Sequence, residues 1–274
     1  MPYRYPPQRN TRWRVRDRRR LFLTIACSVL ILAAGIAGVV LLVKGCGGEP
    51  STPTPTPPPS SSPTPEATPT PTPSPLQGYD FSKPVPERAA VEDSYFADAV
   101  FIGDSRTDGF LLYSGLKGTQ SLFHTGMNVR NILTDSNVTY QGSKMKVTQA
   151  LAKMEYNKVY IMLGINELGW PYVSTFINEY GAVIDAIKAV KPTAQIYVQA
   201  IIPVTATKSS NSIYTNEKIA EFNRAIQKMC EEKQVYYVDL ATGIAPNGVL
   251  AEDGAFDGVH LDRKSTCLNS SHRL

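Results

Sequence analysis

A run of proline, threonine and serine over residues 50–75 divides this chain into two unequal parts. Such a composition cannot bury a hydrophobic core, and its prolines favour an extended polyproline II path. We therefore expect residues 44–77 to form a disordered stalk, which at full extension spans about 80 Å. A folded domain must lie after the stalk, and residues 78–262 are numerous enough to form one.

Residues 21–43, which precede the stalk, contain no charged side chain. At about 1.5 Å per residue, a helix of this length crosses the roughly 30 Å hydrocarbon core of a membrane. Eight arginines lie within residues 1–20, whereas the other flank offers only Lys44. The positive-inside rule then predicts one transmembrane signal anchor, with a basic cytoplasmic N-terminus and an extracytoplasmic domain at the cell surface.

Three other interpretations of the N-terminal region are less favoured. A cleaved secretory signal has a shorter apolar core and a small-residue cleavage site, which this segment does not show before Lys44. Lipid modification of Cys46 fits poorly with a lysine two positions before it. A nucleic-acid-binding arm would explain the arginines, but not their position against an apolar segment.

The charge of the outer domain differs from that of the whole chain. The chain has a formal charge of +4, but from Gly78 onward 19 lysines and arginines face 21 aspartates and glutamates. We therefore expect no nucleic-acid partner. The four cysteines show no spacing typical of a metal site or a disulfide framework, and Cys230 is predicted to pack as a small apolar side chain.

Short β-rich apolar runs alternate with amphipathic segments through the outer domain. Four of these runs are predicted strands, at residues 100–102, 159–163, 196–202 and 235–238. Between them, apolar side chains recur at helical spacing in stretches that begin at Val147, Phe176 and Ile219. This alternation predicts an α/β domain, a three-layer α/β/α sandwich with a mainly parallel sheet. Ligands of such sheets bind beyond the carboxyl ends of the strands.

A serine, a histidine and an aspartate occur where they could form a nucleophilic site. The tripeptide Gly103-Asp104-Ser105 directly follows the first predicted strand. A serine hydroxyl needs a base to take its proton and an acid to orient that base. His260 is the candidate base, and Asp257, three residues before it, is the candidate acid.

Few residues compete for these roles, because the chain has only three histidines. His272 lies in the C-terminal tail, and His124 ends an apolar run, where we expect a satisfied core histidine. Asp253 is the rival of Asp257 as the orienting acid. His260 therefore remains as the predicted base.

Acyl chemistry also needs hydrogen-bond donors for the negative oxygen of a tetrahedral intermediate. Gly126 follows a short apolar run, and a glycine lets a backbone N–H approach a substrate closely. Asn166 follows the strand predicted at 159–163 and offers a neutral amide donor. Each is more often a turn residue when it stands alone, so the prediction depends on the order of all the blocks together.

In this order the blocks resemble the SGNH or GDSL-type hydrolase family over residues 96–262. The resemblance implies a flavodoxin-like SGNH hydrolase fold and a serine mechanism that needs no metal or cofactor. It assigns the nucleophile to Ser105, the base to His260 and the orienting carboxylate to Asp257. The oxyanion donors that it implies are Ser105, through its backbone N–H, Gly126 and Asn166.

Two residues depart from the family pattern. Glu167 stands where an aspartate is usual after the asparagine, and Arg106 stands where an apolar residue is common after the serine. Both lie beside the predicted chemistry, so we expect them to bear on substrate preference more than on mechanism.

These features together predict an extracytoplasmic serine ester hydrolase that acts through an acyl-enzyme. The predicted location favours O-acyl groups of cell-envelope glycans, or small acyl esters, as substrates. An acyltransferase to a surface glycan and a non-catalytic glycan-binding module are the alternatives. Residues 263–274 show no helical pattern, and we interpret them as an anomalous tail that arose by truncation or read-through.

Overall fold

The structure is a computed structural model that describes residues 78–270, with the side chains described as far as residue 266. The predicted cytoplasmic segment, membrane span and stalk fall within residues 1–77 and therefore lie outside the described residues, as does His272. Among residues 78–270, no helix combines the length and the apolar character that a membrane crossing requires.

Five parallel strands form the central sheet, in the order β2-β1-β5-β6-β7. Their bounds are β1 (Ala99–Gly103), β2 (Gln120–Phe123), β5 (Lys158–Met162), β6 (Gln195–Gln199) and β7 (Tyr236–Val238). Counted within this sheet alone, the order is 2-1-3-4-5, which is that of flavodoxin-like doubly wound sheets. A separate antiparallel pair consists of β3 (Val138–Tyr140) and β4 (Ser143–Met145). The predicted α/β fold with a mainly parallel sheet is confirmed.

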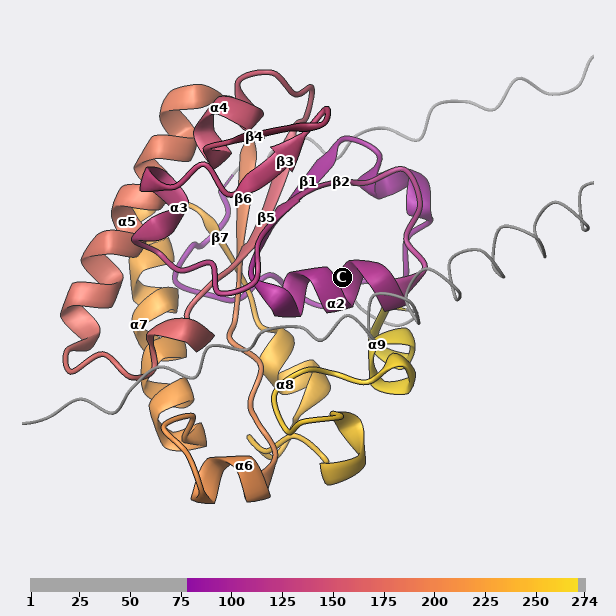
Figure 1. Cartoon of the computed structure of the whole chain (residues 1–274), viewed down its shortest axis with the longest axis vertical. Helices are drawn as coiled ribbons and strands as arrows, with labels where there is room; N and C mark the ends of the chain where they lie inside the picture. The colour runs from indigo at the N-terminus through magenta and orange to yellow at the C-terminus, as the bar shows by residue number, and fades with distance from the viewer. Residues whose placement is uncertain (1–77, 271–274) are drawn as a thin grey trace, which may run out of the picture. The chain divides into compact units, whose positions relative to one another are not determined.

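Helices pack against both faces of this sheet (Figure 1). One face carries α5 (Val173–Val190) and α7 (Asn216–Lys233), and the other carries α2 (Ser105–Ser114). The shorter helices are α3 (Asn131–Thr134), α4 (Val147–Leu151), α6 (Ala206–Ser210), α8 (Leu240–Ile244) and α9 (Arg263–Ser270). Three 3-10 turns complete the described part, namely η1 (Asp93–Phe96), η2 (Ile165–Glu167) and η3 (Glu252–Gly254).

The strands are apolar on both sides because each side faces helices. In β1, Val100 and Ile102 belong to the core shared with α5 and α7, whereas Phe101 faces the opposite way. Phe101 stacks on Tyr160 of β5, with ring centroids 5.0 Å apart, beside partly buried side chains of α2. This two-sided burial explains why the strands read as continuous apolar runs in the sequence.

The three predicted helices form, as α4, α5 and α7, and Cys230 is fully buried in the core, as predicted. The strand predicted at 196–202 is shorter than expected, because β6 ends at Gln199. Beyond it, the side chain of Asn223 takes over the hydrogen bonding of Ile201, with 2.8 Å from its amide nitrogen to the Ile201 carbonyl and 2.8 Å from the Ile201 nitrogen to its oxygen.

The expectation that residues 263–274 lack a helix is wrong over the part that the structure describes. Helix α9 forms at Arg263–Ser270, and the Asp262 carboxylate accepts a hydrogen bond from the Ser265 backbone at 2.7 Å. Thr266 is buried where α9 packs against α2. A capping aspartate and one inward side chain are too weak a signal to predict a helix from periodicity.

Candidate active site

The predicted site residues follow three strands that lie side by side. Strand β1 pairs with β2 on one edge and with β5 on the other, all in parallel. Ser105 follows β1, Gly126 follows β2 and Asn166 follows β5. Because the carboxyl ends of parallel strands meet at one edge of a sheet, the topology places these three segments together.

Ser105 is the first residue of α2, at a tight turn from strand to helix. Asp104 caps the helix, because its carboxylate accepts a hydrogen bond from the Arg106 backbone at 2.8 Å. The turn also requires glycine at position 103, since a Cβ there would lie 2.7 Å from the Met162 carbonyl oxygen and overlap the Thr107 side chain. Packing thus requires the glycine of the Gly-Asp-Ser tripeptide, and helix capping accounts for the aspartate.

A continuous hydrogen-bonded chain joins the predicted nucleophile, base and acid. The Ser105 Oγ lies 2.8 Å from Nε2 of His260, and Nδ1 of His260 lies 2.8 Å from Oδ2 of Asp257. The hydroxyl can therefore pass its proton to an imidazole whose other nitrogen faces a carboxylate. The structure brings these three residues together although Ser105 and His260 are 155 positions apart in the sequence.

A tight turn presents Asp257 and His260. The other carboxylate oxygen of Asp257 accepts hydrogen bonds from the backbone N–H groups of His260, at 2.8 Å, and Val259, at 2.9 Å. Partial burial raises the pKa of Asp257, but the hydrogen bonds from His260 and Val259 outweigh it and lower the pKa to about 2. The rival, Asp253, is exposed on η3, so the geometry selects Asp257 as the partner of the imidazole.

His124 is exposed just beyond the end of β2, so the expectation of a core histidine is wrong. β2 is one of the two edge strands of the sheet, and the chain leaves the core after Phe123. The backbone N–H of His124 still donates to the Gly103 carbonyl, at 3.2 Å.

Asn166 ties together two of the segments around Ser105. Its Nδ2 donates to Oδ2 of Asp104 at 3.1 Å and to the Met127 carbonyl at 2.8 Å. These two bonds engage both hydrogens of the amide. Gly126 lies one residue before Met127, exposed and with φ of 79°, and its carbonyl accepts a hydrogen bond from the Asn131 side chain at 3.2 Å.

A sequence profile of the GDSL-like lipase/acylhydrolase family matches residues 101–264, a span that contains all of these side chains. The chain belongs to this family. As a member, it is an SGNH-type esterase, and the expected enzyme class is confirmed. A search of curated proteins gives no match.

Several solved structures are similar to this GDSL-family esterase. One from Streptococcus pneumonia, named after platelet activating factor, is 23% identical with a TM-score of 0.52, and the match covers 63% of this chain and 80% of that one. A carbohydrate esterase of family 3 from Talaromyces cellulolyticus is 18% identical (TM-score 0.45; 63% and 92% covered). An acetylxylan esterase from Geobacillus stearothermophilus is 17% identical (TM-score 0.44; 63% and 90% covered). At 23% identity, the similarity to the Streptococcus pneumonia structure shows a shared fold and nothing about activity.

Glu167, the neighbour of Asn166 in this esterase, makes a contact with the segment after β2 that the motif spacing did not indicate. Its side chain is completely buried, and its Oε1 accepts a hydrogen bond from the Val129 backbone at 2.7 Å. Burial raises the pKa of Glu167 to about 7, the bond from Val129 opposes this rise, and the nearby Asp104 adds to it. Its departure from the family pattern was the signal that could have drawn attention to it.

Arg106, the other departure from the family pattern, is also buried. Its Nη1 donates to the Ile202 carbonyl at 2.5 Å, while Nε and Nη2 have no hydrogen-bond partner among the described residues. Burial lowers its pKa to about 10, and the negative charges of Asp104 and Asp257 oppose this shift. The guanidinium therefore remains a cation at neutral pH, next to the nucleophile in the chain and close enough to both carboxylates to feel their charge.

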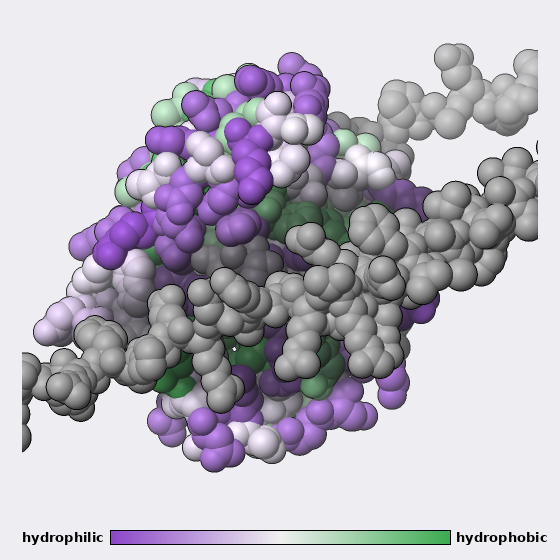
Figure 2. Space-filling model, in the orientation of Figure 1, coloured by the Kyte–Doolittle hydropathy of each residue, from purple (hydrophilic) through white to green (hydrophobic). Residues whose placement is uncertain are grey.

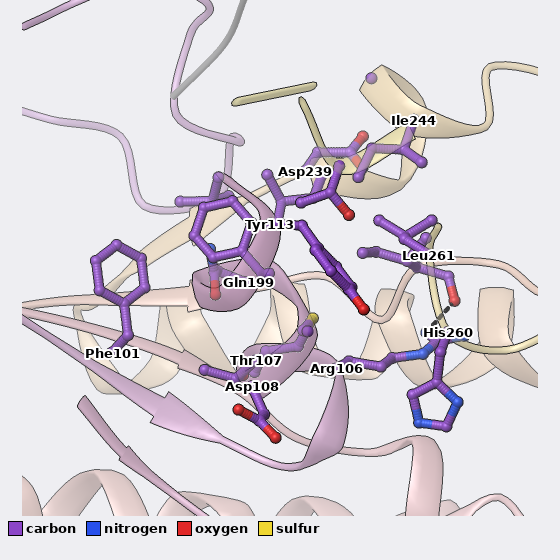
Figure 3. Close-up of a pocket in the computed structure, with 18 of the residues that line it drawn as sticks. Phe101, Arg106, Thr107, Asp108, Tyr113, Gln199, Asp239, Ile244, His260 and Leu261 are labelled. Carbon is purple, nitrogen blue, oxygen red and sulfur yellow. Dashed lines mark hydrogen bonds between the residues drawn. The ribbon is translucent and has the colours of Figure 1, made fainter. Parts of the chain in front are cut away.

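A cavity of about 500 Å³ opens beside Ser105 and His260. Figure 3 shows Arg106 and Tyr113 of α2, together with Asp239 and Ile244 from the segment after β7, among the side chains that line it. On the face drawn in Figure 2, hydrophilic surface covers the region of α4 and α5, and hydrophobic surface shows near α2. Among the described residues, no group of His, Cys, Asp or Glu side chains gathers in a way that would hold a metal ion.

Proposed function

We propose that this protein hydrolyses carboxylic esters through an acyl-enzyme on Ser105, with His260 as the base and Asp257 as its orienting acid. The observation that carries the proposal is the hydrogen-bonded chain from Ser105 Oγ through the His260 ring to Asp257, with both distances at 2.8 Å. Membership of the GDSL-like lipase/acylhydrolase family supports the same chemistry.

The reaction follows from this geometry. Ser105 Oγ attacks the ester carbonyl carbon while its proton passes to Nε2 of His260. The tetrahedral intermediate collapses when the imidazolium returns that proton to the leaving alcohol, which leaves an ester on Ser105. Water then attacks this ester, with His260 again taking the proton, and the acid leaves as Ser105 is restored. Asp257 holds the ring with Nδ1–H toward itself and stabilises the imidazolium that forms at each step.

Three donors are proposed to stabilise the oxyanion of each tetrahedral intermediate. The backbone N–H of Ser105 belongs to the first turn of a helix, where N–H groups are unpaired and the helix dipole favours negative charge. Gly126 contributes its backbone N–H, and Asn166 contributes its side-chain amide. To donate to the oxyanion, Asn166 must give up one of the two hydrogen bonds that it makes to Asp104 and Met127.

The proposed substrates are O-acyl groups of cell-envelope glycans or small acyl esters. The support comes from the sequence, because an uncharged segment at 21–43 and a Pro/Thr/Ser segment at 44–77 are typical of a domain held outside the membrane. Protease treatment of intact cells tests the location, and release of acetate from acetylated wall glycan tests the substrate. Cleavage of aryl acetates without any release from wall material would reject the glycan assignment.

Substitution of Ser105 tests the mechanism. Ser105→Ala removes the nucleophile, so we expect kcat for p-nitrophenyl acetate to fall by roughly 10⁴-fold or more while the fold persists. Ser143→Ala, at an exposed position on β4, is the matched control and should retain the parent activity. Circular dichroism checks the fold of each variant. A folded Ser105→Ala variant with parental kcat would reject Ser105 as the nucleophile.

A further inference from the structure

We propose that Glu167 is a positioning residue. It fixes the Gly126 loop against η2, the turn that carries Asn166, and thereby sets the distance between the oxyanion donors Gly126 and Asn166. The Gly126 loop is defined as residues 124–130, between β2 and α3. The inference rests on the proposed function, because it concerns donors that matter only for acyl chemistry. It adds a residue that has no contact with the reacting atoms.

Two consecutive residues of η2 hold two alternate residues of the Gly126 loop. Asn166 donates to the Met127 carbonyl at 2.8 Å, and Glu167 accepts from the Val129 backbone N–H at 2.7 Å. Both Met127 and Val129 are fully buried, so each bond forms away from water. A donor and an acceptor on neighbouring side chains thus hold the loop at two points. These points are Met127, which directly follows Gly126, and Val129.

The two bonds are not equivalent during turnover. Both amide hydrogens of Asn166 are engaged, with Asp104 and Met127, so the amide must release one of them when it donates to an oxyanion. If it releases Met127, the bond from Val129 to Glu167 is the remaining side-chain bond between the two segments among the described residues. Glu167 therefore keeps the Gly126 N–H in place when Asn166 turns to the substrate.

The burial of Glu167 indicates that its carboxyl serves more than packing. Its exposed fraction is 0%, and its Oε2 has no hydrogen-bond partner in the described part of the chain. Burial of a half-satisfied carboxyl is costly, and an apolar side chain of the same length would fill the space without this cost. The one bond that the carboxyl makes to another segment is the bond to the Gly126 loop, so the structure assigns the residue's role to that bond.

Two substitutions of similar length separate the hydrogen bond from the packing. Glu167→Met fills the space but cannot accept from Val129, whereas Glu167→Gln keeps an acceptor oxygen. In the full chain purified in detergent, we expect Glu167→Met to lower kcat for p-nitrophenyl acetate by roughly 10- to 100-fold, because a misplaced oxyanion donor acts on the transition state. KM should stay within about twofold, and Glu167→Gln should recover most of kcat.

Glu179→Gln is the matched control, since Glu179 holds the same loop from the surface, through Arg130 at 3.2 Å. It should keep the parent kcat, because the pair is exposed and the loop is fixed from inside. A folded Glu167→Met variant with kcat within twofold of the parent overturns the proposal. So does a Glu167→Gln variant as impaired as Glu167→Met, because the hydrogen bond would then not be the cause.

Hydrogen exchange at the Val129 amide tests the same bond without relying on activity. We expect slow exchange in the parent and in Glu167→Gln, and exchange at least tenfold faster in Glu167→Met. An unprotected Val129 amide in the parent overturns the proposal even if either variant fails to fold. Failure of the proposed function looks different, because the parent would then lack esterase activity or keep it in Ser105→Ala, whatever Val129 shows.

Discussion

Two carboxylates of the candidate site, those of Asp257 and Glu167, differ in almost every respect in their surroundings. The Asp257 side chain is 41% exposed and accepts three hydrogen bonds, two of them from His260. Glu167 is fully buried and accepts one hydrogen bond from another segment, that of Val129. The pKa of Asp257 falls to about 2, whereas that of Glu167 rises to about 7.

The difference shows what each side of the site requires. Asp257 must be ionised throughout turnover, since it faces an imidazole that gains and loses a proton, and hydrogen bonds in partial contact with water secure its charge. Glu167 needs only an acceptor oxygen for Val129, and a carboxyl supplies one whether or not it is ionised. The proton-transfer side of the site thus depends on charge, and the oxyanion side depends on position.

Among changes to these two carboxylates and their surroundings, the largest effect is expected when the charge of Asp257 is removed. Asp257→Asn keeps the shape of the side chain but replaces an acceptor with an amide that favours the wrong tautomer of His260. We expect kcat to fall by roughly 10³-fold with little change in stability. Measurement of kcat for p-nitrophenyl acetate at pH 7.5 checks this, with circular dichroism as the test of folding.

Asp253→Asn is the control for this prediction, because Asp253 is four residues away on the same segment and exposed on η3. It should leave kcat unchanged. If Asp253→Asn were as damaging as Asp257→Asn, the loss would reflect the charge of the segment and not the contact with His260.

The next largest effect is expected in the pH dependence of stability. Because folding raises the pKa of Glu167 from 4.5 to about 7, the folded state holds the proton more tightly than the unfolded state. Stability should therefore fall as pH rises from about 4.5 to 7, on the order of 3 kcal/mol for this group, and level off above. Glu167→Gln should lack this slope in urea unfolding, whereas Glu179→Gln should keep it.

Neighbouring groups shape this titration without reversing it. Asp104 is close enough to Glu167 for its charge to raise the pKa of Glu167, and burial raises the pKa of Asp104 too, so it adds a slope of the same sign. Tyr180 of α5 is also close, but its pKa lies well above its usual value, so it stays neutral in this range. The contribution of Asp257 has the opposite sign, since its lowered pKa stabilises the fold above about pH 4 and this is lost toward pH 2. A Glu167→Gln variant with the full parental slope would contradict the assignment.

Much of the fold could be predicted from the sequence, because its signals are local. Buried parallel strands read as short apolar runs, and α5 and α7 read as amphipathic stripes. Two of the elements that were missed show what such a pattern leaves out: α9 depends on the Asp262 cap and on contact with α2, and the β3-β4 pair is only three residues on each side. Both are decided by tertiary contacts that periodicity does not record.

The site shows the same division. The pairing of Ser105, His260 and Asp257 was predictable, since the chain has few histidines and the blocks occur in a known order. The contact of Glu167 with Val129 was not, because the two residues are 38 positions apart and one partner is a backbone N–H. Backbone groups carry no sequence identity, so a contact of this kind is visible only in three dimensions.

The smallest effect on kcat is expected from a change in the backbone turn that carries Asp257, the exposed carboxylate. Gly258, between Asp257 and His260, has φ of 81°, and a Cβ there would lie 2.8 Å from Cβ of Lys208 and 2.9 Å from Oγ1 of Thr205. Gly258→Ala must therefore shift the turn, and we expect kcat to fall about tenfold. Gly248→Ala is the control, since its φ is 70° with no atom within 4 Å of an added Cβ. Both variants should lose about 1 kcal/mol of stability from the backbone, but only Gly258→Ala should lose kcat. Equal kcat in the two variants would mean that the exposed side of the site tolerates displacement, and that position matters on the buried side alone.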